Sequence, residues 1–207
     1  MSILNEIIEH KIVAIIRGAN SADVLKIAEA LYEGGVRILE ITMNSSKPLA
    51  VIEQVSDQLG EKMIVGAGTV LDPETAREAI LVGAKFILSP IVNVETIKMS
   101  KTYGVVNIPG AHTATEIVYA YQNGGDIIKV FPATSPAYIK DILGPLSHIP
   151  LLPTGGVNLE NINEFKKAGA SGFGIGSALV DTKKDVTEEY LVELTSKARK
   201  FVQAIAS

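Results

Sequence analysis

The chain of 207 residues contains no cysteine. This absence excludes disulfide scaffolds, thiol catalysis and zinc–thiolate sites. An excess of basic charge is also missing, because 19 Lys and Arg stand against 23 Asp and Glu, which gives a formal net charge of -4. A nucleic-acid binder needs concentrated Lys and Arg to displace counterions from phosphates, so no nucleic acid is expected as a partner.

Long apolar runs are absent as well. No window of the sequence approaches the roughly 20 apolar residues that a membrane-spanning helix needs. Residues 1–11 read MSILNEIIEHK, with isoleucines on one face of a helix and glutamates on another. A secretory signal peptide needs a basic start and an unbroken apolar stretch of roughly 7 to 15 residues, which this segment lacks. We therefore expect a short amphipathic N-terminal helix, no membrane partner and a cytoplasmic location.

Short apolar runs, by contrast, recur along the whole chain. Their starts lie roughly 20 to 25 residues apart, which is the length of one strand, one helix and two short loops. Most are continuously apolar, as is typical of parallel strands that are buried on both faces. The eight runs are residues 12–16, 37–42, 63–67, 85–89, 105–108, 127–131, 150–153 and 172–175.

The segments between these runs have helical spacing. Ser21, Asp72 before Pro73, and Thr113 three residues before Glu116 are the expected N-terminal caps. The repeat predicts an α/β fold, a (β/α)8 TIM barrel with an extra N-terminal helix. A doubly wound open sheet is the alternative, but the repeat is uniform and no Ser- or Pro-rich linker interrupts it. We therefore predict a single domain over residues 1–207. The helices are predicted at residues 22–32, 47–59, 74–82, 94–102, 114–123, 138–143, 159–168 and 187–206.

One predicted strand contains a charged residue, Lys129, within an otherwise apolar run. Burying an unpaired ammonium costs free energy, and desolvation lowers the pKa of a lysine. The free amine that results is able to attack a carbonyl and form an imine. Alternatively, the stem of the side chain lies on apolar surface and its charged end reaches water. The strand context alone leaves both interpretations open.

A carboxylate, Glu40, interrupts another predicted strand between Leu39 and Ile41. If Glu40 and Lys129 project into one cavity, the carboxylate is placed to move the protons that imine chemistry requires. The alternative is a buried ion pair that serves structure only. Such pairs are seldom net stabilising, which favours the functional interpretation. Polar residues also stand at the ends of two other predicted strands, at Arg17 and Thr69.

Two glycine-rich segments accompany the last two predicted strands. They read PTGGVN over residues 153–158 and GFGIGS over residues 172–177. In barrels, the loops after the seventh and eighth strands commonly bind phosphate, because glycine lets backbone amides approach an anion. Alternatively, the glycines only permit tight turns. The three histidines, His10, His112 and His148, have no spacing typical of a metal site, so no metal is expected.

These residues lie in motifs that resemble the bacterial class I aldolases acting on 2-keto-3-deoxy-6-phosphogluconate (KDPG) and 4-hydroxy-2-oxoglutarate (KHG). The resemblance runs almost from end to end, in the order and spacing of the family. It is carried by VAIIRG, GGVRILEITMN, VGAGTVLDPE, GAKFILSP, NIPGAHTATE, IIKVFPA, LLPTGGVNLENI and GIGSALV.

The resemblance implies a role for each matching position. Lys129 is the imine-forming lysine and Glu40 the general acid and base. The chain departs from the family at Asn44, where some members carry an arginine that binds the substrate carboxylate. Arg17, expected in the mouth with an anionic group of the substrate, is then expected to take over this contact. The resemblance also places Thr69, Pro90 and Thr154 near the pyruvyl portion, and Gly155, Gly156, Gly176 and Ser177 around the phosphate.

The activity implied is cleavage of a small 2-keto-3-deoxy acid. KDPG would give pyruvate and glyceraldehyde 3-phosphate, and KHG would give pyruvate and glyoxylate. The resemblance also implies a homotrimer that needs no metal or organic cofactor. The alternatives are an aldolase for the galactonate epimer of KDPG, another phosphate-binding barrel such as an epimerase or decarboxylase, and a non-catalytic barrel that binds sugar-acid phosphates.

Overall fold

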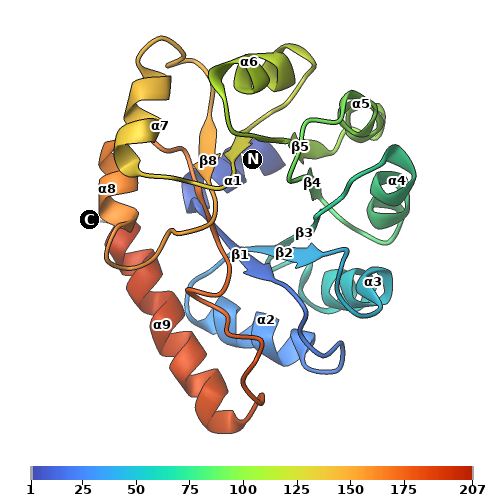
Figure 1. Ribbon diagram of the computed structural model, residues 1–207. Helices are drawn as coiled ribbons and strands as arrows, with labels where there is room; N and C mark the ends of the chain where they lie inside the picture. Colours follow the sequence, from blue (N-terminus) through green and yellow to red (C-terminus); the bar gives the residue numbers. More distant parts are fainter. Residues whose placement is uncertain (1, 207) are drawn as a thin grey trace.

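Parallel strands form the centre of the molecule in a computed structural model that describes residues 2–206 (Figure 1). All eight apolar runs contain a strand, as predicted, and every strand pair is parallel. A two-residue strand, β6, was not predicted; it follows directly after Pro109. The strands are β1 (Ile12–Ile16), β2 (Ile38–Thr42), β3 (Ile64–Gly68), β4 (Phe86–Leu88), β5 (Val106–Ile108), β6 (Gly110–Ala111), β7 (Ile128–Val130), β8 (Leu151–Pro153) and β9 (Phe173–Ile175).

Within residues 2–206, these strands form two sheets. One has six strands in the order β5-β4-β3-β2-β1-β9, and the other has three in the order β6-β7-β8. The sheets meet at two places. Thr154, just after β8, forms a parallel bridge with Gly174 of β9. At the other place only Pro109 separates β5, which pairs with β4, from β6, which pairs with β7. The fold is therefore of the α/β class with parallel strands.

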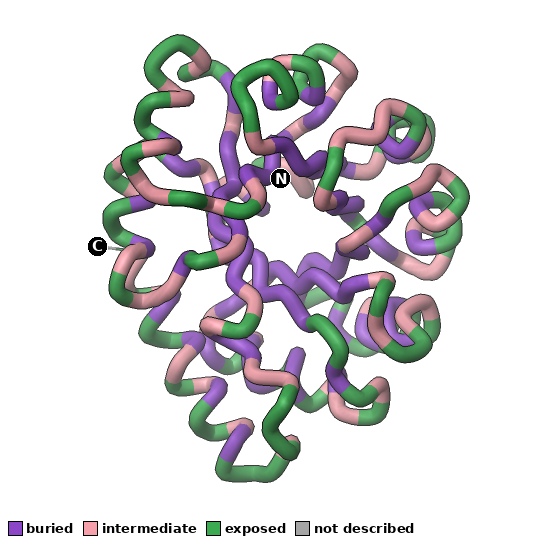
Figure 2. The backbone as a smooth tube through the Cα atoms, viewed as in Figure 1, coloured by how far each residue is buried: buried purple, intermediate pink, exposed green. Residues whose placement is uncertain are grey.

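Helices surround the strands, and the outer sides of these helices are exposed (Figure 2). The predicted caps at Asp72 and at Thr113 are confirmed, the latter as a capping box with Glu116. The predicted cap at Ser21 is wrong: Asn20 closes a turn onto Ala22 and Asp23, so the helix begins only after Asp23. The helices are α1 (Ile3–His10), α2 (Val24–Glu33), α3 (Pro48–Leu59), α4 (Pro73–Leu81), α5 (Val94–Thr102), α6 (Ala114–Gln122), α7 (Pro136–Leu143), α8 (Ile162–Lys167) and α9 (Glu188–Ala206).

The predicted N-terminal helix is confirmed as α1, although Met1 lies outside the described residues. Its fully buried Ile7 packs in one apolar cluster with side chains from one face of the strands, here called the inner face. Members of this cluster include Val13, Ile38, Ile64, Ile127 and Leu152. The opposite face packs against the surrounding helices in a second, larger cluster. Helix α1 thus covers the inner face near the N-terminal ends of the strands.

Strand geometry then determines which residues stand above this apolar layer. Side chains two residues apart in a strand point to the same face. Glu40 therefore shares the inner face with Ile38, and Lys129 shares it with Ile127.

Among residues 2–206, no helix combines the length and apolar character that a bilayer crossing requires.

Candidate active site

Lys129 lies in β7, where it pairs in register with Gly110 of β6 and Leu152 of β8. Only 1% of the residue is exposed, which excludes the interpretation that its charged end reaches water. Its Nζ atom lies 4.8 Å from the centroid of the Phe131 ring. Burial lowers the pKa of Lys129 below its ordinary value of 10.5; Glu40 partly opposes this and Arg17 adds to it. The lowered pKa increases the fraction of free, nucleophilic amine.

Glu40 lies in β2, in register with Ile15 of β1 and Gly66 of β3. The residue is fully buried, and neither carboxylate oxygen has a hydrogen-bond partner among the described residues. Burial raises the pKa of Glu40 above its ordinary value of 4.5, while the positive charges of Lys129 and Arg17 lower it in part. Within residues 2–206, Glu40 forms no ion pair within 4.0 Å.

Burial therefore favours the uncharged form of both groups, a free amine and a carboxylic acid. This pair of protonation states suits attack on a ketone. The amine supplies the nucleophile, and the acid supplies the proton that the carbonyl oxygen takes up before it leaves as water.

The space for the Glu40 side chain exists because residue 68, at the end of β3, is glycine. A Cβ atom placed on Gly68 would lie 1.8 Å from Glu40 Oε1 and 2.3 Å from its carboxyl carbon. Such distances are far inside the normal contact range of non-bonded atoms. Gly68 is thus required for the observed position of the carboxylate.

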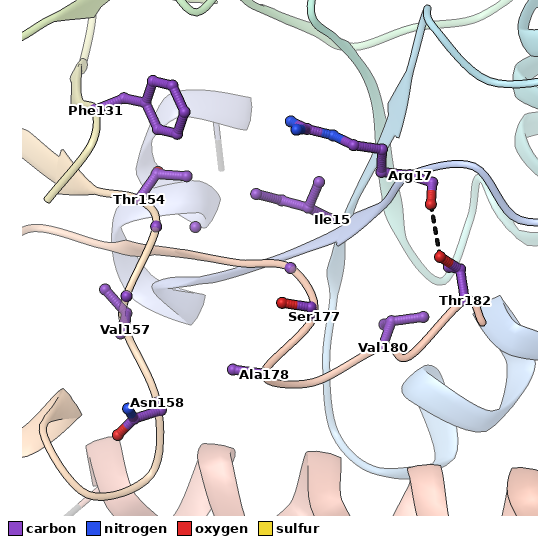
Figure 3. Close-up of a pocket in the computed structure, with 14 residues that line it drawn as sticks. Ile15, Arg17, Phe131, Thr154, Val157, Asn158, Ser177, Ala178, Val180 and Thr182 are labelled. Carbon is purple, nitrogen blue, oxygen red and sulfur yellow. Dashed lines mark hydrogen bonds between the residues drawn. The ribbon is translucent and has the colours of Figure 1, made fainter. Parts of the chain in front are cut away.

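A cavity of about 360 Å³ opens at the C-terminal ends of β1, β8 and β9 (Figure 3). Phe131, whose ring packs near the Lys129 amine, is part of its wall. The cavity brings together six of the residues that the sequence analysis assigned to substrate binding. These are Arg17, Thr154, Gly155, Gly156, Gly176 and Ser177.

The backbone of the glycine loop is left-handed at two successive residues, with φ angles of +82° at Gly155 and +80° at Gly156. Only glycine adopts this conformation without strain. The Asn161 side chain holds the loop through two hydrogen bonds to its backbone. Its Nδ2 donates to the Gly156 carbonyl at 2.8 Å, and its Oδ1 accepts from the Asn158 N–H at 2.9 Å. The result is an open stretch of backbone without side chains, which an anion can approach closely.

Two predicted substrate residues lie outside this cavity. Pro90 lines a neighbouring cavity of about 390 Å³, and Phe131 stands in the wall of both. Thr69 follows β3 with a positive φ of 58° and lines neither of these two cavities. The described residues contain no group of three or more His, Cys, Asp or Glu side chains that could hold a metal ion.

Sequence reasoning missed Phe131, Thr182 and Gly68. Phe131 follows Lys129 by two residues, so strand alternation could have placed both side chains on the same face. Gly68 stands in the VGAGTV motif, but its role depends on a contact with Glu40 of the neighbouring strand β2. Thr182 lies in the segment between β9 and α9, and no sequence signal marks it.

A buried lysine with a lowered pKa and a buried carboxyl group with a raised pKa, on the same face of the strands, suit the chemistry of an aldolase, a carbon–carbon lyase. Comparison with known proteins agrees. The model of the KDPG and KHG aldolase family matches residues 3–194. The chain therefore belongs to the KDPG and KHG aldolase family.

Individual relatives extend this result. The 2-dehydro-3-deoxy-phosphogluconate aldolase of Pseudomonas aeruginosa is 37% identical over 160 residues, which covers 76% of this chain and 72% of the relative. The 2-dehydro-3-deoxy-6-phosphogalactonate aldolase of Escherichia coli is 35% identical over 171 residues, 81% of this chain and 83% of the relative. A solved structure described as native KDPGal superposes with a TM-score of 0.87 at 34% identity, over 94% of both chains.

Proposed function

We propose that the chain is a class I aldolase that cleaves KDPG to pyruvate and glyceraldehyde 3-phosphate through an imine on Lys129. The observation that carries this proposal is the buried lysine amine, with its pKa lowered, on the same inner face as a buried carboxyl group. Membership in the KDPG and KHG aldolase family supports it.

The reaction begins when the Lys129 amine adds to the C2 ketone. Glu40, as an acid, gives a proton to the carbinolamine hydroxyl, which leaves as water, and a protonated imine remains. Glu40, now a carboxylate, removes the proton of the C4 hydroxyl. The bond between C3 and C4 breaks, its electrons move toward the imine nitrogen, and the aldehyde leaves.

The enamine then takes a proton from Glu40 at C3, and water adds to the resulting imine. Collapse of the carbinolamine releases pyruvate and restores both the free amine and the acid. Every proton removed by Glu40 is thus returned within one cycle. The protonated imine accepts the electrons of the broken bond, so the proposed mechanism uses no metal and no organic cofactor.

We assign the anionic groups of the substrate to different parts of the cavity. The carboxylate lies one bond from the imine carbon and therefore belongs near Lys129. Arg17 is the group proposed to bind it, because its charge acts on both Lys129 and Glu40. Gly155, Gly156, Gly176 and Ser177 are proposed to hold the phosphate.

The remaining substrate contacts are assigned to the pyruvyl portion. Thr154, which lines the same cavity, is proposed to contact it. Pro90 and Thr69 keep this role as proposals that rest on the family motif alone.

We further propose that the two sheets close into one (β/α)8 barrel and that residues 1–207 form a single domain. The bridge between Thr154 and Gly174 and the direct succession of β5 and β6 support closure. A homotrimer in the cytoplasm is proposed from the family resemblance. Exposed apolar side chains at Leu71, Ile91 and Tyr119 are in accord with subunit contacts.

The experiment that tests the activity measures pyruvate release, coupled to lactate dehydrogenase, from KDPG, its galactonate epimer and KHG. Because the cavity offers a glycine-lined anion site, we expect the phosphorylated acids to exceed KHG in kcat/KM by at least about tenfold, the factor that one net hydrogen bond to a charged group contributes. The Lys129→Met variant should be inactive, and Lys26→Met, at an exposed lysine, should match the wild type. A folded wild-type protein that releases pyruvate from none of the three substrates would overturn the proposal.

A further inference from the structure

Both ends of one peptide bond in the mouth of the cavity are held by side chains from distant loops. The carbonyl oxygen of Arg17 accepts a hydrogen bond of 2.8 Å from Thr182 Oγ1 (Figure 3). The N–H of the next residue, Gly18, donates a hydrogen bond of 2.9 Å to Ser45 Oγ. A peptide group bonded at both ends resists rotation, so the backbone on which the Arg17 side chain stands is fixed.

Ser45 is itself anchored to the strand that carries Glu40. Its hydroxyl lies 2.9 Å from Thr42 Oγ1 in a hydrogen bond, and Thr42 is fully buried at the end of β2. Thr42 follows Glu40 by two residues and therefore shares its face of the strand. The Arg17–Gly18 peptide is thus tied to the strand of the proposed acid on one side and to the segment before α9 on the other.

The Arg17 side chain has no comparable anchor of its own. Its guanidinium extends across the cavity toward Phe131 (Figure 3). Among the described residues, it forms neither an ion pair nor a side-chain hydrogen bond. The place where this guanidinium meets a ligand therefore depends on how firmly the backbone beneath it is held.

We propose that Ser45 and Thr182 are positioning residues for Arg17, which hold its backbone so that the guanidinium meets the substrate carboxylate. This inference rests on the proposed function, in which Arg17 binds that carboxylate. Each hydroxyl is bonded to this peptide, and through it both residues are inferred to act on binding by way of Arg17. Both residues are only partly buried, and hydrogen bonds at such positions contribute modestly to folding.

The test compares KM and kcat for KDPG in the Ser45→Ala and Thr182→Val variants. We expect KM to rise about fivefold in each, the factor that one net hydrogen bond contributes to an equilibrium, while kcat stays within about twofold. Thr182→Ser keeps the hydroxyl and should restore the wild-type KM. Ser46→Ala, beside Ser45 but exposed, is the matched control and should change neither constant.

A merely structural role is separated from positioning by repeating both substitutions in an Arg17→Gln background. Residues that act through Arg17 have nothing left to position there, so KM should not rise further. An equal rise of KM in the Arg17→Gln background would overturn the proposal. In the wild-type background, the proposal would be overturned if both single variants kept the wild-type KM, or if both lost only kcat.

The proposed function is tested separately by trapping the wild-type protein with pyruvate and borohydride. An adduct on Lys129, together with Ser45→Ala and Thr182→Val variants that behave like the wild type, would overturn the positioning role and leave the aldolase proposal intact. Absence of the adduct would overturn both.

Discussion

Replacing Gly68 by alanine tests how strictly the Glu40 carboxylate must be placed. The new methyl group would lie 1.8 Å from Oε1 and 2.5 Å from Cγ of Glu40. Non-bonded atoms in contact lie about 3.5 Å apart, so the carboxyl group has to move by more than about 1 Å. The β3 backbone is tied to its neighbours by parallel ladders, so the side chain is the part that yields.

The expected magnitude follows from this displacement. Misplacing a catalytic group by about 1 Å lowers the rate about 100-fold, which corresponds to about 2.7 kcal/mol of transition-state stabilisation. Overpacking of a buried site also destabilises the fold by about 1–3 kcal/mol. We therefore expect Gly68→Ala to fold, with a lower free energy of unfolding and kcat about 100-fold below the wild type.

Gly66→Ala is the matched control. It lies on the same strand and the same face, and its Cβ would lie 2.4 Å from the ring of Phe86, which belongs to the apolar layer next to α1. The assay is pyruvate release at saturating KDPG, with urea unfolding of each variant. Gly66→Ala should lose stability and keep most of its kcat. If Gly68→Ala retains kcat within twofold, or if both variants lose activity in proportion to stability, the reasoning is wrong.

Three further predictions address protons and metals. Glu40→Gln should lower kcat by about 10²- to 10⁴-fold, the usual contribution of a general acid or base, while a pyruvate adduct on Lys129 still forms; near-normal turnover would refute the assignment. The rate of imine trapping at low pyruvate should rise with pH as the Lys129 amine loses its proton, and fall at higher pH as the Glu40 acid loses its own. In Glu40→Gln the fall at high pH should be absent, because an amide has no proton to lose there; a profile that still falls would contradict the assignment of Glu40 as the acid. Dialysis against EDTA should leave kcat unchanged, and activity restored only by added metal would contradict the imine mechanism.

The sequence predicts most of the strands well because their side chains are continuously apolar. Continuous apolar runs such as residues 12–16 arise where both faces of a strand are buried, and β1 (Ile12–Ile16) occupies that run. β6 escapes detection because two residues, Gly110 and Ala111, carry no pattern. Its existence depends on pairing with β7, which lies farther along the chain.

The two residues proposed as catalytic could also be singled out from the sequence, because a charge inside an apolar strand is conspicuous. Lys129 and Glu40 both stand out in this way, and the structure places both on the inner face. The residues proposed to position Arg17 were not predictable. The bond between Thr182 and the Arg17 carbonyl spans 165 positions, and the bond between Ser45 and the Gly18 N–H spans 27. Partners of this kind are set by the packing of loops at one end of the strands.

An imine on Lys129 is tested most directly by the intact mass of the protein after incubation with pyruvate and borohydride, followed by peptide mapping. We expect one reduced pyruvyl adduct per chain, on Lys129, and none in the Lys129→Met variant. An adduct on a different lysine, or no adduct on a folded protein, would contradict the central claim that this buried amine forms the imine.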